Sequence, residues 1–218
     1  MNFRLSFIEN EINVDYEYVR CIEIENKKVF YHFVDVLNKL SNGDYVDDFY
    51  FLNDKVDFAV FIDYFNIDYN SKKITNCIHK IVKEKLDDFS YDVILKNYKR
   101  IQNEFCKILN EIDISLSISE EMNLEGLIKL LNVNILYSDD LLKNLLLMID
   151  IFKVVEKSSI LVFVNLKEYL TKEELKELYK YALYNHILII LVDNKAYGVC
   201  QEYEKKLIVD DDLEEFML

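Results

Sequence analysis

The sequence predicts an α/β protein whose sheet-forming part is interrupted, after about residue 70, by an α-helical module. The clearest evidence lies near the C-terminal end, where two continuous apolar runs, 160–164 and 187–192, flank the helical pattern of residues 172–184. Continuous apolar runs are typical of parallel strands that are buried on both faces. A strand, a helix and a second strand at this spacing form a βαβ unit.

The first 70 residues are expected to form strands around one helix. Phe3, Leu5 and Phe7 alternate with polar residues, as in a strand with one buried face. Apolar residues between 29 and 40 follow helical spacing, and the turn sequence 41–44 ends that helix. Further strands are predicted at 19–24, 49–52 and 56–62.

Two long amphipathic helices are predicted next, at about 72–87 and 91–110, because their apolar residues recur at helical spacing. Residues 87–90 join them, and Ser90 is placed to cap the second helix. A connection this short predicts an α-hairpin.

This pattern gives a domain prediction. Residues 1–70 and 111–218 form a discontinuous α/β head, and residues 71–110 form an α-helical leg. Part of 139–156 is a candidate addition to the leg.

The stretch after the leg is polar and acidic before regular patterns return. Thr171 is placed to cap the helix of 172–184, and Glu174 at its third position completes a capping box. The remaining elements are predicted as strands at 112–116, 133–137 and 207–209 and helices at 123–131 and 139–155.

Catalytic motifs are missing from the sequence. The three glycines are isolated, so no glycine-rich loop can hold a phosphate group. The three histidines lie outside any nucleophile motif, and no carboxylate group has a nuclease signature. We therefore expect the protein not to be an enzyme.

The compartment is expected to be the cytoplasm. The four cysteines have no metal-binding spacing and fit reduced thiols, and the N-terminus does not have the apolar character of a signal peptide. The apolar runs are far shorter than the roughly 18 residues that a membrane span needs, so no membrane contact is expected.

The charge is distributed unevenly. The chain has a net charge of −14, yet residues 72–107 carry nine Lys or Arg and five Asp or Glu, which leaves −18 on the rest. On a helical wheel Lys96, Arg100 and Lys107 fall within about 40° of one another, opposite the apolar residues. Such a face is either an ordinary solvated surface or a surface that follows DNA phosphates without reading sequence.

Several blocks of the sequence resemble one known family. The strand 160–165, the segment Tyr169-Leu170-Thr171-Lys172-Glu173-Glu174 and the strand 188–192 are similar to the C-terminal region of the ring-forming spacer-acquisition protein of type II-A CRISPR systems. The resemblance covers nearly the whole chain in patches. Shorter matches follow the same order, at residues 1–5, 24–30, 67–71, 110–113 and 150–153.

The resemblance implies a fold and a function. The fold would be an α/β head, similar to a truncated NTPase core with flanking helices and no phosphate loop, with an inserted α-helical leg. The function would be non-catalytic binding of double-stranded DNA, entered from its ends, as a homotetrameric ring during spacer acquisition in bacterial antiviral defence. The implied partners are the CRISPR integrase proteins and the type II effector nuclease.

The resemblance also implies site residues. The DNA-binding candidates are the basic residues of the leg, namely Lys80, Lys83, Lys96, Lys99, Arg100 and Lys107. Family members bind Ca²⁺, and carboxylate oxygens are the ligands that this ion prefers. By analogy the calcium candidates are Asp113, Glu121 and Glu125. No catalytic residues are carried over.

Two other functions stay open from the sequence. An acidic adaptor, or an inhibitor whose surface mimics DNA, would bind a basic partner and have no affinity for DNA. A metal-dependent nuclease or phosphatase would show turnover with Mg²⁺ or Mn²⁺ that depends on its carboxylates.

Overall fold

The computed structural model describes residues 1–218 apart from 53–56, 120, 156–159, 196 and 198–201, and for 72, 73 and 155 it describes the backbone only. The chain divides into two compact units. The sheet unit consists of Met1–Tyr69 and Tyr137–Leu218, and the helical unit consists of Asn70–Leu136. The helical unit therefore continues past residue 110, where the sequence places the end of the leg, because its last helix packs on its first.

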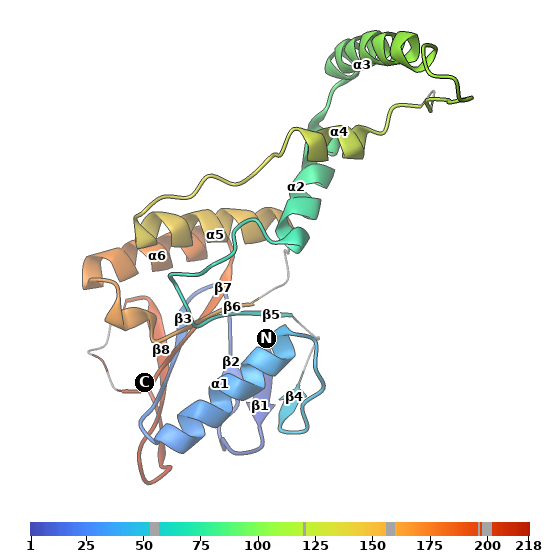
Figure 1. The fold of residues 1–218 in the computed structure, drawn as a ribbon. Coiled ribbons are helices and arrows are strands. Elements are labelled where there is room, and N and C mark those ends of the chain that lie inside the picture. The colour runs from blue at the N-terminus through green and yellow to red at the C-terminus, as the bar shows by residue number, and fades with distance from the viewer. Residues whose placement is uncertain (53–56, 120, 156–159, 196, 198–201) are drawn as a thin grey trace. The chain divides into compact units, whose positions relative to one another are not determined.

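A six-stranded sheet forms the centre of the sheet unit (Figure 1). Five neighbouring strands are parallel, and the last is antiparallel to its neighbour. Four of the five parallel strands are almost wholly buried, and two of them, β6 and β7, have the continuous apolar runs that such burial favours. In sheet order the strands are β5 (Phe58–Phe61), β6 (Ile160–Val164), β7 (Leu188–Asp193), β3 (Val19–Ile24), β8 (Glu204–Val209) and β9 (Glu215–Met217).

The predicted βαβ unit is confirmed. Strands β6 and β7 pair in parallel, with Ile160 opposite Leu188, and α6 (Lys172–Tyr184) connects them. The capping box is confirmed too, because the Thr171 side chain accepts from Glu174 N while the Glu174 carboxylate accepts from Thr171 N at 2.8 Å.

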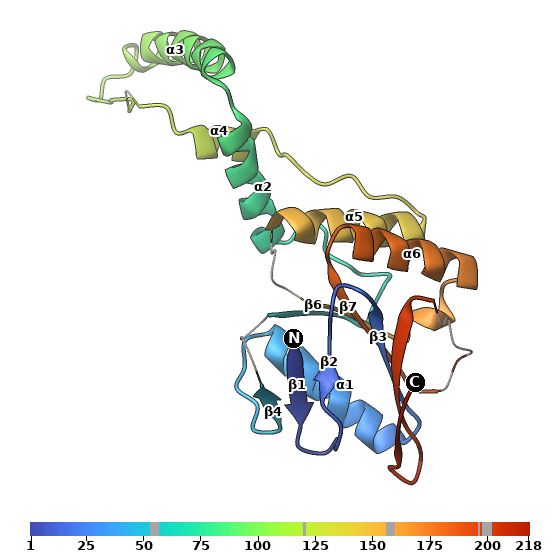
Figure 2. The same cartoon turned by 180° about the vertical axis from the view of Figure 1, so that it is seen from behind.

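One face of the main sheet packs against α1 (Lys27–Ser41) and a small antiparallel sheet (Figure 2). The small sheet has the order β2 (Ile12–Asn13), β1 (Asn2–Leu5), β4 (Phe49–Phe51). Aromatic rings join the two sheets: the ring of Phe58 on β5 lies 5.7 Å from that of Phe3 and 5.5 Å from that of Phe49.

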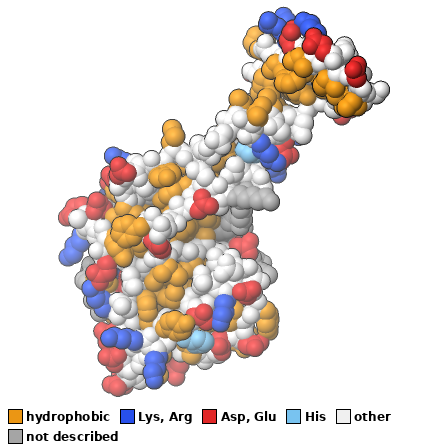
Figure 3. Space-filling model, viewed as in Figure 1, with side chains coloured by type: hydrophobic (Ala, Val, Ile, Leu, Met, Phe, Trp, Pro, Cys, Tyr) orange, Lys and Arg blue, Asp and Glu red, His pale blue; other side chains and the backbone are white. Residues whose placement is uncertain are grey.

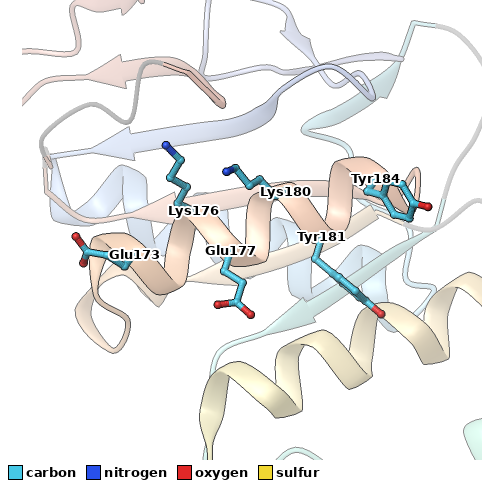
Figure 4. Close-up of a pocket in the computed structure, with 6 residues that line it drawn as sticks. All are labelled: Glu173, Lys176, Glu177, Lys180, Tyr181 and Tyr184. Atoms are coloured by element: carbon cyan, nitrogen blue, oxygen red, sulfur yellow. The ribbon is translucent and has the colours of Figure 1, made fainter.

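The opposite face of the main sheet is covered by α5 (Leu141–Val155) and α6, which run side by side (Figure 1). A short 3-10 helix, η1 (Leu166–Glu168), follows β6. On α6, Tyr181 points toward α5 and its hydroxyl donates to Asp150 at 2.8 Å (Figure 4). Lys176 and Lys180 point to the other side of α6, where both ammonium groups lie over the ring of Tyr203.

The helical unit contains α2 (Lys72–Lys85), α3 (Asp88–Leu109) and α4 (Leu124–Leu130). The three helices agree with the sequence, but the predicted α-hairpin is wrong, because α2 packs on α4 and no residue of α3 is buried. The predicted strands at 112–116 and 133–137 are also wrong, since neither segment has a partner strand among the described residues. Within the described part of the chain, no helix combines the length and apolar character that a membrane crossing requires.

Candidate nucleic-acid interface

The longest helix of the protein, α3, begins at a cap formed by Asp87. The Asp87 carboxylate accepts a hydrogen bond from Ser90 N at 2.7 Å, so Asp87 is the N-cap residue. The prediction that Ser90 caps this helix is wrong. This backbone hydrogen bond lowers the pKa of Asp87 below its ordinary value. Asp88 in the first turn and Lys107 in the last turn match the helix dipole, which favours anions at the N-terminus and cations at the C-terminus.

The six DNA-binding candidates are all exposed, two on α2 and four on α3. Two of them have acidic neighbours on their own helix: Lys107 Nζ lies 2.7 Å from Glu104 Oε1, and Lys80 Nζ lies 4.0 Å from Glu84 Oε1. The other four form no ion pair with any residue that the structure describes; they are Lys83, Lys96, Lys99 and Arg100.

Cationic and apolar side chains occupy different sides of α3. Lys and Arg side chains gather along one edge of this helix, and hydrophobic side chains cover another (Figure 3). The C-terminal part of the apolar side, predicted to be buried in a hairpin, is instead open to solvent, with exposed fractions of 54% for Ile101 and 56% for Phe105. No residue of this helix is fully buried in the single chain, and both its cationic and its apolar side reach the surface.

The three calcium candidates lie in the helical unit but are not gathered at one point. The carboxylate of Glu125 is held by Lys129 Nζ at 2.6 Å, and this hydrogen bond lowers the pKa of Glu125. Asp113 and Glu121 are exposed. Among the described residues, no group of three or more His, Cys, Asp or Glu side chains is arranged to hold a metal ion. These residues do not fit a calcium centre in this arrangement, and calcium binding stays a prediction from the resemblance.

A cluster of buried charges lies inside the sheet unit. It was not predicted from the sequence. Its members come from four separate elements, and each is less than 10% exposed. The members are Glu23, Lys167, Asp193, Glu204 and Lys206. The only signal in the sequence is the presence of charged residues within otherwise apolar strands, such as Glu23 in Val-Arg-Cys-Ile-Glu-Ile.

Distances within this buried charge cluster show how its charges are balanced. Lys206 Nζ lies 2.6 Å from Glu23 Oε1, and Lys167 Nζ lies 3.2 Å from Glu204 Oε1 and 3.8 Å from Asp193 Oδ2. Burial raises the pKa of Asp193 to about 7, and neither of its oxygens has a hydrogen-bond partner. With Asp193 protonated, two carboxylates face two ammonium groups, and the cluster is neutral.

The turn between β3 and α1 offers no phosphate-binding loop. It contains no glycine, and the Asn26 side chain itself accepts hydrogen bonds from Lys28 N and Val29 N. These are the amide groups that a phosphate would need at a helix N-terminus.

Together, a mostly parallel sheet and an inserted helical unit with exposed cations on α3 define an α/β protein with a helical insertion. The family model described as "CRISPR-associated protein (Cas_Csn2)" matches residues 44–213. The chain therefore belongs to the CRISPR-associated Csn2 family, which confirms the resemblance found in its sequence and gives it a CRISPR-associated role.

One solved structure aligns with nearly the whole chain at low identity. No curated protein matches the chain. Among solved structures, a putative ABC transporter ATP-binding protein from Pyrococcus furiosus aligns with 7% identity over 94% of this chain and 97% of that chain. The TM-score of 0.43 is low, so we draw nothing from this likeness.

Proposed function

We propose that this protein binds double-stranded DNA at its ends, without sequence preference and without catalysis, as a homotetrameric ring during CRISPR spacer acquisition. The observation that carries the proposal is the face of α3 on which Lys96, Lys99 and Arg100 are exposed and form no ion pair with a described residue. Lysine and arginine side chains neutralise DNA phosphates, and binding through phosphates does not depend on sequence.

The charge outside the helical unit favours the same surface. Residues 70–136 contain ten basic and ten acidic residues, so the whole net charge of −14 falls on the sheet unit. A strongly acidic unit repels DNA, and DNA would therefore be confined to the cationic face of α3.

Three further observations support the remaining parts of the proposal. The glycine-free turn capped by Asn26 supports a truncated NTPase-like core that has no phosphate chemistry of its own. The exposed apolar side of α3, with Ile101, Phe105 and Ile108, supports assembly, because a second copy would remove this surface from water. Membership of the family supports the CRISPR integrase proteins and the type II effector nuclease as partners, and the cytoplasm as the compartment.

The experiment is a gel-shift comparison of linear and covalently closed circular duplex DNA across a salt series. We expect binding to linear DNA only, weakened steeply by salt, because a closed ring can be loaded only from an end. The double variant Lys96→Glu with Arg100→Glu should abolish binding and keep the assembly. The matched control Lys27→Glu with Lys28→Glu reverses two exposed charges in the first turn of α1 and should bind normally.

Other outcomes would favour other functions. A folded, assembled protein that binds neither DNA form would support an acidic adaptor or a DNA-mimicking inhibitor. Turnover of DNA with Mg²⁺ or Mn²⁺ would support a nuclease. Equal binding to linear and circular DNA would contradict loading from ends.

A further inference from the structure

An aromatic pocket lies in the sheet unit, at the carboxyl ends of β5 and β6. Its volume is about 480 Å³. In parallel sheets this edge is where ligands commonly bind. Its lining includes Tyr64, Phe65, Tyr69, Tyr137, Asp139 and Tyr169, and all of them belong to the sheet unit.

Buried rings hold exposed rings in place on both sides of this pocket. The buried ring of Tyr64 lies 5.3 Å from the ring of Tyr169, and the Tyr64 hydroxyl donates to the carbonyl of Val164 at 2.8 Å. The ring of Phe65, which is 83% exposed, meets Tyr169 edge to face.

On the other side, the buried Tyr69 ring is stacked on Tyr137 at 5.3 Å, and Tyr137 is 64% exposed. The exposed rings of Tyr137 and Tyr169 are therefore each packed on a buried ring, and Phe65 contacts Tyr169.

The polar part of the pocket has one carboxylate without an ion partner. Ser138 and Asn144 form two hydrogen bonds with each other. Ser138 N donates to Asn144 Oδ1 at 2.8 Å, and Asn144 Nδ2 donates to Ser138 O at 2.7 Å. Asp139 is exposed and forms no ion pair with a residue that the structure describes. No Lys or Arg is among the described residues that line the pocket.

We infer that this pocket binds an arginine side chain of a basic protein segment. Aromatic faces attract cations through the ring quadrupole, and the planar guanidinium stacks on rings better than a lysine ammonium does. The same guanidinium can donate two hydrogen bonds to one carboxylate, here that of Asp139. A nucleic-acid base could also stack on these rings, but its phosphates would approach a unit that carries the whole net charge of −14.

The test uses the full-length protein and a short acetylated Gly-Arg-Gly peptide, with a peptide in which citrulline replaces arginine as the neutral control. Chemical-shift changes in the amide spectrum report where the peptide binds and how strongly. We expect the arginine peptide to shift amides around Phe65 and residues 137–141, and the citrulline peptide to bind about tenfold more weakly. Phe65→Ala and Asp139→Asn should each lower the affinity for the arginine peptide about three- to tenfold.

Controls separate this site from general attraction to an acidic surface. Tyr184→Ala and Asp47→Asn remove an exposed ring and an exposed carboxylate elsewhere in the sheet unit and should leave binding unchanged. Lack of binding by the arginine peptide, equal binding of the citrulline peptide, or displacement by a single-stranded oligonucleotide would each overturn the inference. The variant Lys96→Glu with Arg100→Glu should keep peptide binding, so failure of the DNA proposal would leave this one standing.

Discussion

Lys206 and Glu23 form an ion pair inside the sheet: Lys206 Nζ lies 2.6 Å from Glu23 Oε1, and the two side chains are 1% and 0% exposed. Lys206 also donates to the carbonyl of Tyr197 at 2.8 Å. Removing one partner of a buried pair leaves an uncompensated charge in a medium of low dielectric constant, which costs far more than the pair contributes. The free energy of unfolding is therefore expected to depend strongly on both members of this ion pair.

Lys206→Met tests this dependence directly. We expect it to lower the free energy of unfolding by about 3–5 kcal/mol in urea titrations, because Glu23 loses its closest cation. Lys205→Met is the matched control on the same strand. Lys205 lies 3.2 Å from Asp15 and is 41% exposed, so its loss should cost about 1 kcal/mol. If the two substitutions lower the free energy of unfolding equally, the buried pair does not matter more for stability than the exposed one.

Asp193 predicts a pH dependence of stability. Its folded pKa of about 7 lies above the ordinary value of 3.8, so the folded chain holds a proton that the unfolded chain releases. The stability that this carboxyl contributes is thus fully present below about pH 4. As the pH rises to about 7 that contribution is lost, and the free energy of unfolding falls by up to about 4 kcal/mol. Asp193→Asn should remove this part of the pH dependence of the melting temperature, whereas Asp211→Asn at an exposed turn should keep it.

The capping box of α6 predicts a smaller effect. Thr171→Ala should lower the free energy of unfolding by about 1 kcal/mol, because the side chain that accepts from Glu174 N is lost. Glu174→Gln should cost less, since an amide oxygen can still accept from Thr171 N. A larger loss for Glu174→Gln than for Thr171→Ala would contradict the capping role of the hydroxyl.

The cationic face of α3 predicts how salt weakens DNA binding. Each neutralised phosphate adds about 0.9 to the slope of log K against log salt, so Lys99→Ala should reduce that slope by about this amount. Lys27→Ala, in the sheet unit, should not change it. An unchanged slope for Lys99→Ala would remove that residue from the interface.

The apolar side of α3 predicts a change of assembly without a change of fold. Ile101→Asp with Phe105→Asp should lower the molar mass measured by light scattering, since a second copy would have to bury two charges. Because no residue of α3 is buried in the single chain, the circular dichroism spectrum should stay the same. An unchanged molar mass would place the contact between copies elsewhere.

Elements with strong local signals could be predicted from the sequence. The strands β6 and β7 were visible as apolar runs, and α6 was visible from its capping box. The prediction of strands at 112–116 and 133–137 was wrong, because an apolar run forms a strand only where a neighbouring strand pairs with it. Ile114 is 68% exposed and Leu136 is 90% exposed, and neither has a strand beside it in the described structure.

The buried charge cluster could not be predicted, because it depends on long-range register. Glu23, Lys167 and Lys206 lie far apart in the sequence and meet only when β3 lies beside β8 and η1 follows β6. The exposed cations of α3 could be predicted because helical spacing alone places them on one face. Their use for DNA and the role of Asp113, Glu121 and Glu125 stay predictions.

The position of β3 has a consequence for synthesis on the ribosome. Both of its neighbours, β7 and β8, come from the far end of the chain, so that Arg20 pairs with Ile190 on one side and Lys205 on the other. The helical unit leaves the ribosome before either neighbour has been translated. Both edges of this strand therefore stay unpaired through most of translation. Unpaired strand edges promote aggregation and are bound by chaperones.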